Sequence, residues 1–307
     1  MIDLAGIVPP VATPFTADGD VDTASLERLC AFLLDAGVDG LFAGGSTGEI
    51  ALLTDGQRDT VVRTVVGTAA GQVPVLVGAV DTGTRRVIDH ARRAETLGAD
   101  AVVVTAPFYV GVHPDEVTAH YRLVHDSIGV PVVAYDIPSA VHTGLPASSL
   151  AELAQSRHIA AVKDSSGDLS AFRRVLRLTE GTGLRVLTGS ELLCDLALGL
   201  GAHGAVPGLG NVDPDGYVRL AAAAFTGDAE TATAEQERLV ELFDITSVAD
   251  RSRVGPSAVA LGAFKTALYL RGVIDHPAAA APLRPLDEAE TDRIRDLLTR
   301  AGLGVVR

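Results

Sequence analysis

Lysine is rare in this chain, and its rarity draws attention to the two lysines present. Only Lys163 and Lys265 are lysines among the 25 basic residues, so arginine supplies the positive charge elsewhere. Arginine stays protonated in proteins, whereas a desolvated lysine can become a neutral amine and attack a carbonyl group. The two lysines are therefore candidates for covalent chemistry on a carbonyl substrate.

Lys163 directly follows the apolar run 159–162, which predicts a buried β-strand. Its side chain would leave that strand among apolar neighbours, and such burial lowers the pKa of an amine, as Schiff-base formation requires. The alternative is a structural lysine in an ion pair with Asp164 or another carboxylate. Lys265 lies inside the helical sequence 262–268, where a structural or helix-docking role is the better interpretation.

The glycine-rich segment 44–49 reads Gly-Gly-Ser-Thr-Gly-Glu and could bind an anion through successive backbone N–H groups. It lacks the lysine of a Walker motif and the G-x-G-x-x-G spacing of a dinucleotide site. A small carboxylate therefore fits better than a nucleotide, and the hydroxyls of Ser46 and Thr47 add further donors.

Tyr135 ends the apolar run 130–135 and is expected on the same rim as Lys163. A phenol in that place could relay protons to and from an imine intermediate. The alternative is an aromatic side chain at the edge of the core whose hydroxyl is satisfied by a hydrogen bond.

Eight short apolar runs place these residues in a repeating architecture. From about residue 7 to 204 the runs recur roughly every 28 residues, which is the spacing of βα units in an eight-stranded barrel. They are apolar throughout rather than alternating, as parallel strands covered on both faces are. We therefore predict an α/β fold, a (β/α)8 TIM barrel. The predicted strands are 6–12, 38–43, 73–77, 101–104, 130–135, 159–162, 184–187 and 204–206.

The repeat ends after residue 226, where helical patterns follow one another with no strand between them. We predict a barrel domain, 1–226, and a C-terminal appendage of three helices, 227–307. The helices are expected at 229–243, 257–271 and 287–301, and the proline-rich stretch 276–285 is expected to be a loop.

Active sites of such barrels lie at the carboxyl ends of the strands. The polar segments that follow the predicted strands are therefore expected to meet at one end of the barrel. These segments are 44–49, 105–109, 135–138, 163–168, 188–191 and 207–211.

The composition narrows the classes of partner. A net charge of −14 repels phosphate backbones and anionic lipids, so we expect neither a nucleic acid nor a membrane partner. The N-terminal sequence lacks a basic leader, and we expect a cytoplasmic protein. The eight histidines form no H-x-x-x-H or H-E-x-x-H pair, and the two cysteines lie far apart, so no metal site is predicted.

Three motifs together carry a family resemblance. Residues 45–49 read G-S-T-G-E, residues 135–138 read Y-D-I-P, and residues 162–164 read V-K-D. In this order and spacing they resemble the dihydrodipicolinate synthase and N-acetylneuraminate lyase superfamily of class I, Schiff-base-forming aldolases. The resemblance runs from about residue 6 through the C-terminal helices, and it implies a lyase that needs no cofactor because the lysine forms the imine.

The resemblance implies a role for each matching residue. Lys163 would form the imine with pyruvate or another 2-keto acid, and Tyr135 would shuttle the proton. Ser46 would link Tyr135 to a second tyrosine, Tyr109, which in the family reaches into a neighbouring subunit. Thr47 would bind the keto-acid carboxylate through its backbone N–H.

Further positions follow from the same resemblance. Gly45 belongs to the carboxylate-binding loop, and Gly189 and Val206 match positions that contact the pyruvyl group or the lysine. The role of Tyr109 implies an oligomer, expected to be a homotetramer built as a dimer of dimers.

The segment 138–144 departs from the pattern of the dihydrodipicolinate synthases, which have an arginine here that binds the carboxylate of the aldehyde substrate. This chain reads Pro-Ser-Ala-Val-His-Thr-Gly, where His142 would be a weaker substitute. An aldolase or dehydratase of 2-keto-3-deoxy sugar acids is therefore the leading specific prediction. The alternative is 4-hydroxy-tetrahydrodipicolinate synthase, acting on pyruvate and aspartate semialdehyde, with Arg85, Arg251 or Arg253 replacing the missing arginine.

Two other classes of function remain open from the sequence. A phosphate-ligand barrel enzyme would bind orthophosphate near residues 208–211 and form no covalent adduct. A non-catalytic keto-acid sensor would use the same pocket to regulate a partner, although it would not need the proton relay of Tyr135 and Tyr109.

Overall fold

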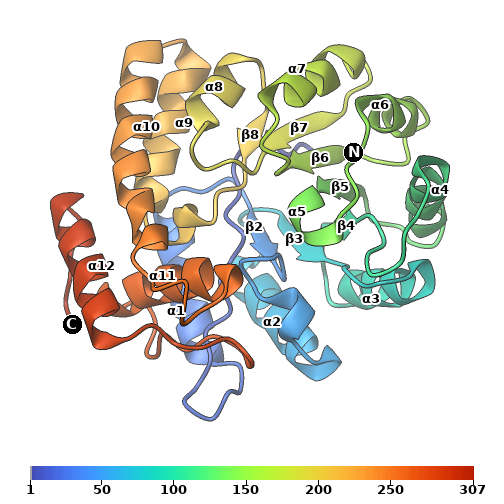
Figure 1. Ribbon diagram of the computed structural model, residues 1–307. Coiled ribbons are helices and arrows are strands. Elements are labelled where there is room, and N and C mark those ends of the chain that lie inside the picture. The colour runs from blue at the N-terminus through green and yellow to red at the C-terminus, as the bar shows by residue number, and fades with distance from the viewer. Residues whose placement is uncertain (1) are drawn as a thin grey trace.

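The computed structural model describes residues 2–307 as a closed barrel ringed by helices (Figure 1). Eight parallel strands form one sheet in the order β1-β8-β7-β6-β5-β4-β3-β2. The two ends of the sheet meet where Pro10 bridges Phe42 and the N–H of Val11 donates to the Phe42 carbonyl at 2.9 Å. The predicted (β/α)8 TIM barrel is confirmed.

Each strand overlaps its predicted apolar run, although five of the eight extend one or two residues beyond the carboxyl end of the run. They are β1 (Gly6–Ile7), β2 (Leu41–Ala43), β3 (Val75–Gly78), β4 (Ala101–Thr105), β5 (Val132–Asp136), β6 (Ala161–Asp164), β7 (Arg185–Thr188) and β8 (Gly204–Ala205). Lys163 belongs to β6 rather than following it, because its backbone continues the ladder and pairs in register with Tyr135 of β5. The two side chains therefore start from neighbouring positions of adjacent strands.

Helices follow the strands and cover the outside of the barrel. They are α1 (Thr23–Asp35), α2 (Asp55–Ala69), α3 (Thr84–Thr96), α4 (Pro114–His125), α5 (Pro138–Val141), α6 (Ala147–Gln155), α7 (Leu169–Leu178), α8 (Cys194–Gly199) and α9 (Pro214–Thr226). The local sequence explains where several of these helices begin. Thr54 and Gln57 form a capping box at α2, and α4 and α9 each begin with a proline at the first helical position.

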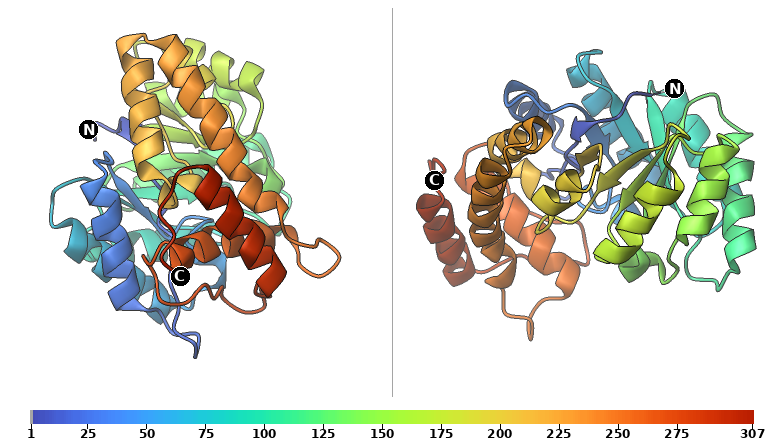
Figure 2. Two further views of the ribbon diagram at one scale, coloured as in Figure 1. Left: turned by 90° about the vertical axis from the view of Figure 1, so that its left-hand side faces the viewer. Right: turned by 90° about the horizontal axis from the view of Figure 1, so that it is seen from above.

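The C-terminal helices are α10 (Ala229–Phe243), α11 (Pro256–Leu270) and α12 (Glu288–Arg300), which agree with the predicted bounds within one residue. Helix α10 runs beside α9 (Figure 2). Helix α11 lies against the barrel, where Leu261 and Phe264 help to line a cavity at the strand ends. The division into domains at residue 226 stays a prediction, since α11 and the barrel share this cavity.

The apolar interior has an inner and an outer layer. The inner layer fills the barrel with side chains such as Val8, Phe42, Leu76 and Leu187. The outer layer packs the other faces of the strands against the helices. Within residues 2–307, no helix combines the length and apolar character that crossing a bilayer requires. The two layers fix the strands so that their carboxyl ends form a rigid frame for the site.

Candidate active site at the carboxyl ends of the strands

A cavity of about 390 Å³ opens at the carboxyl ends of the strands. It brings together side chains from segments that lie far apart in the sequence, as predicted for a barrel site. Six of the predicted site residues line it: Ser46, Thr47, Tyr135, Lys163, Gly189 and Val206. Gly45 lines an adjoining cavity of about 290 Å³ that shares Ser46 and Tyr135 with the first.

Lys163 lines this cavity and is only 5% exposed. Its Nζ is 4.2 Å from the ring centroid of Tyr135 and 5.4 Å from that of Phe42. Among residues 2–307, the lysine forms no ion pair with a carboxylate. The amine is therefore surrounded by aromatic faces and open to a small molecule in the cavity.

Tyr135 is buried beside this amine, and two opposing effects set the pKa of its hydroxyl. Burial raises the pKa, but the charge of Lys163 and hydrogen bonding with Ser46, Ser165 and Lys163 lower it more. The net result is a pKa below the ordinary value of a phenol. Such a hydroxyl gives up and takes back a proton more readily, which suits an acid–base role next to an imine.

Gly189 is required by the close approach of its neighbours. A Cβ at this position would lie 2.0 Å from Oγ of Ser165 and 2.9 Å from Cε of Lys163. Gly45 is under a similar constraint, because its Cβ would lie 2.8 Å from Cε1 of Phe42. Both glycines therefore leave room for the side chains that shape the cavity.

Two predicted residues lie outside the cavity in the protomer. Tyr109 is 93% exposed and has a φ of +73°, so its side chain projects from the loop after β4. His142 caps the C-terminus of α5 with a φ of +58°, and it is exposed and lines neither cavity. Ser139, from the same segment, lines the cavity instead. The short helix α5 turns the chain so that His142 faces solvent.

The structure adds residues that the sequence analysis did not assign to the site. Glu191 lines the cavity, and its Oε1 accepts a hydrogen bond from the N–H of Leu209 at 2.6 Å. Burial raises the pKa of Glu191 to about 7, although this N–H and the charge of Lys163 act in the opposite direction. Ser165 also lines the cavity, and both residues belong to polar segments that follow predicted strands. Phe264 comes from α11, and no pattern in the sequence points to it.

The second lysine has a different environment. Lys265 of α11 forms a buried ion pair with Glu49, and its Nζ donates to the carbonyl of Ala278 at 2.8 Å. Burial lowers the pKa of Lys265 to about 8, against the opposing effect of Glu49. Glu49 also accepts from the N–H of Ala280 at 2.7 Å. Lys265 therefore ties α11 to the loop after β2, which agrees with the structural role predicted for it.

A parallel barrel with a buried lysine and an acidic phenol at its strand ends has the architecture of a class I aldolase. Comparisons with known proteins agree. The model of the dihydrodipicolinate synthetase family matches residues 3–301. The chain therefore belongs to this family and is a lyase of the class I aldolase type.

Relatives and solved structures cover nearly the whole chain. It is 36% identical to a DapA-like lyase of Halobacterium salinarum, described as uncharacterized, over 98% of this chain and 95% of the relative. It is 32% identical to the 4-hydroxy-tetrahydrodipicolinate synthase of Haloarcula marismortui, over 97% and 94%. The crystal structure of YagE from E. coli K12, a prophage protein of the same family in complex with pyruvate, is 30% identical with a TM-score of 0.91, over 98% and 99%.

Proposed function

We propose that this lyase acts on pyruvate or another 2-keto acid through an imine formed by Lys163. The observation that carries the proposal is the position of Nζ, buried 4.2 Å from the ring centroid of Tyr135 and unpaired with any carboxylate among residues 2–307. A neutral amine in this cavity attacks the keto carbon, and loss of water from the adduct gives the imine. Tyr135 supplies and recovers the protons that these steps require.

The imine then determines which bond can break. Its protonated nitrogen accepts the electron pair released when a carbon–carbon bond to the keto acid's side chain is cleaved, which yields an aldehyde and an enamine. Protonation of the enamine and hydrolysis release pyruvate and restore Lys163. Dehydration would instead start from the uncleaved imine: the carbon next to the imine carbon loses a proton, and the resulting enamine expels the hydroxyl of the following carbon, which leaves as water.

For the partner substrate we propose a polyhydroxylated chain, as in 2-keto-3-deoxy sugar acids. Besides Lys163, the cavity lining presents the hydroxyls of Ser139, Ser165 and Ser257 and the carboxyl group of Glu191. None of the described residues that line either cavity is an arginine. A substrate with a second carboxylate would lose water on entering the cavity and would find no arginine there to bind both oxygens of that carboxylate.

The alternative, 4-hydroxy-tetrahydrodipicolinate synthase, is favoured by the name of the Haloarcula relative. It requires an arginine from elsewhere to bind aspartate semialdehyde. Arg253 is held by Glu290 and by the carbonyl of Pro285, and Arg85 is exposed. Pyruvate release from 2-keto-3-deoxy acids, compared with condensation on aspartate semialdehyde, distinguishes the two substrates by kcat/KM.

We also propose that Tyr109 completes the site of a second copy, in a homotetramer built as a dimer of dimers. An aromatic side chain that is 93% exposed, beside the exposed Val110, is supporting evidence for a contact between subunits. Specific activity measured against protein concentration tests this. Equal activity in a verified monomer would remove Tyr109 from the mechanism.

The imine itself is tested by borohydride reduction in the presence of pyruvate, followed by peptide mapping. The chain has two lysines, so the map distinguishes Lys163 directly from Lys265. We expect one reduced pyruvyl adduct on Lys163 and none in Lys163→Ala. An unmodified parent protein, or an adduct on Lys265, would disprove the assignment. A keto-acid sensor would trap the adduct but would release no product from any keto acid.

A further inference from the structure

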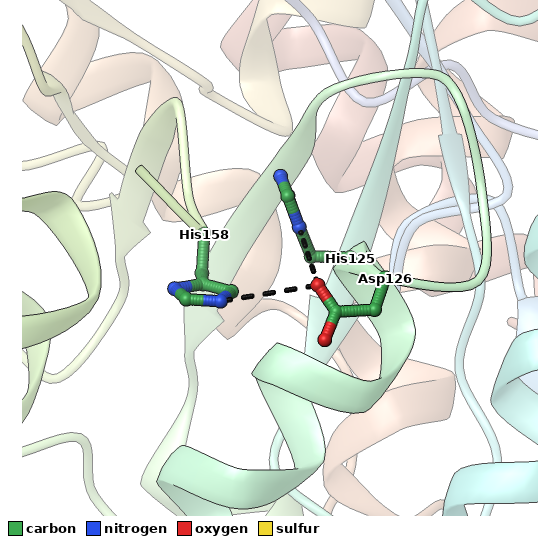
Figure 3. Close-up of side chains that lie close together, drawn as sticks. All are labelled: His125, Asp126 and His158. Carbon is green, nitrogen blue, oxygen red and sulfur yellow. Dashed lines mark hydrogen bonds and ion pairs between the residues drawn. The ribbon is translucent and has the colours of Figure 1, made fainter. Parts of the chain in front are cut away.

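A cluster of three potential metal ligands lies outside the catalytic cavity. His125 is the last residue of α4, Asp126 caps that helix, and His158 lies between α6 and β6. Figure 3 shows the carboxylate of Asp126 facing both imidazoles. Oδ1 of Asp126 is 3.1 Å from Nδ1 of His125 and 3.9 Å from Nε2 of His158.

Hydrogen bonding fixes which nitrogen of His158 can bind a cation. Nδ1 of His158 is 2.8 Å from Oγ of Ser156, and the Ser156 hydroxyl itself donates to the carbonyl of Glu152 at 2.7 Å. The serine oxygen therefore accepts from Nδ1–H, which leaves the lone pair of neutral His158 on Nε2. This is the arrangement found for metal-bound histidines, whose second nitrogen donates to an outer oxygen.

The lone pair on Nε2 faces the carboxylate of Asp126 across 3.9 Å. The two atoms attract each other only when a proton or a metal ion lies between them. In a tetrahedral zinc site with bonds of about 2.0–2.2 Å, neighbouring ligand atoms are about 3.3 Å apart. The observed 3.1 Å and 3.9 Å bracket that separation, and the three ligand atoms all lie within 4.8 Å of one another.

We propose that His125, Asp126 and His158 form a binding site for a divalent transition-metal ion, with Zn²⁺ as the preferred occupant. Imidazole nitrogens favour Zn²⁺, Ni²⁺ and Cu²⁺ over Mg²⁺ and Ca²⁺, which take oxygen ligands. The side chains of His125 and Asp126 are 41% and 64% exposed, so water completes the coordination. The C-terminus of α4 adds the partial negative charge of its last carbonyl groups.

Two arginines, Arg122 and Arg157, lie near the cluster, and burial and, more weakly, the charge of Arg122 lower the pKa of His158. Arg122 is one turn back on α4, and its guanidinium is paired with Glu152. The sequence predicts no metal site, because its histidines form no pair at helical spacing. The ligands come instead from two segments that only the folded barrel brings together.

The proposed site has a structural consequence. It joins the end of α4 to the loop that leads into β6, the strand that carries Lys163. This is the end of the barrel opposite the catalytic cavity, where residues contribute to stability rather than to chemistry. Zn²⁺ at about 100 times its dissociation constant should raise the Tm by roughly 4 °C.

Zinc titration calorimetry on the tag-free full chain, after removal of metals with EDTA, tests the proposal. We expect one Zn²⁺ per chain with micromolar affinity, at least about 100-fold weaker binding in His158→Ala and Asp126→Asn, and about 10-fold weaker binding in Ser156→Ala. Asp115→Asn and His276→Ala are the matched controls, because they remove a carboxylate of the same helix and an exposed histidine outside the cluster. Both should bind as the parent does.

Several results would overturn the proposal. They are no saturable binding tighter than about 100 µM in the parent, parental affinity in the two ligand variants, equal weakening in Asp115→Asn, or equal affinity for Mg²⁺. Circular dichroism and lyase activity confirm that each variant is folded, and kcat/KM should stay at the parental value in all of them.

Discussion

Lys163 and Lys265 each hold their Nζ 4.2 Å from the centroid of an aromatic ring, Tyr135 for the first and Phe15 for the second. Both are almost fully buried. Lys265 is paired with Glu49 and bonded to a backbone carbonyl, whereas Lys163 has a phenol beside it and a cavity in front of it. Burial alone therefore does not distinguish the lysine proposed to react from the one that forms an ion pair, and the groups that face each amine do.

The largest effect is expected from Lys163→Arg. Arginine keeps the charge and much of the volume but cannot become a neutral nucleophile, so turnover should fall by at least about 10⁴-fold. The free energy of unfolding should change little. A steady-state assay measures turnover, and urea unfolding measures the free energy of unfolding. If the variant kept a few per cent of parental turnover, Lys163 would not be the nucleophile, and the proposed difference between the two lysines would be wrong.

Lys265→Met should show the opposite profile. It leaves Glu49 buried without its partner, which typically costs about 3–5 kcal/mol of unfolding free energy. Borohydride should still trap pyruvate on Lys163 at temperatures where the variant is folded. The double variant Glu49→Gln/Lys265→Met should recover part of the loss. If Lys265→Met is as stable as the parent, the ion pair does not hold α11 in place.

Tyr135→Phe tests the partner of the reactive amine. The ring and its packing remain, and only the hydroxyl proposed to exchange protons is lost. We expect kcat to fall by about 10²-fold while KM changes little. Pyruvate trapping should still occur, but more slowly. Turnover near the parental value would assign the proton relay to another group.

The smallest expected effect is a difference in the pH dependence of stability. The native state releases the proton of Lys265 near pH 8, below the ordinary pKa of 10.5 that applies in the unfolded chain. Between these pH values the unfolded state binds more protons, so stability rises with pH, by up to about 1.4 kcal/mol per unit. Urea unfolding at pH 8, 9 and 10 should show this rise in the parent relative to Lys265→Met. Parallel profiles would contradict it.

The architecture and the centre of the site could be predicted because both follow from local patterns and one geometric rule. Apolar runs mark the strands, and the carboxyl ends of parallel strands meet, so residues such as Thr47, Lys163 and Val206 had to converge. The direction in which α11 crosses the barrel depends on long-range packing, and Phe264 was missed for that reason. His142 lies outside both cavities of the protomer because the one-turn helix α5, which no pattern in the sequence predicts, ends at this residue.

The scarcity of lysine has a practical consequence for chemical modification. Because Lys163 and Lys265 are 5% and 1% exposed, the folded surface offers amine-directed reagents no freely accessible lysine side chain. Acylation of Lys265 must therefore await local opening around α11, whereas Lys163 is reached only by reagents small enough to enter the cavity. The rate of modification at Lys163 therefore reports access to the mouth of the barrel. The rate at Lys265 reports how often α11 opens from the barrel. A keto acid bound as an imine would block modification of Lys163 and leave the rate at Lys265 unchanged.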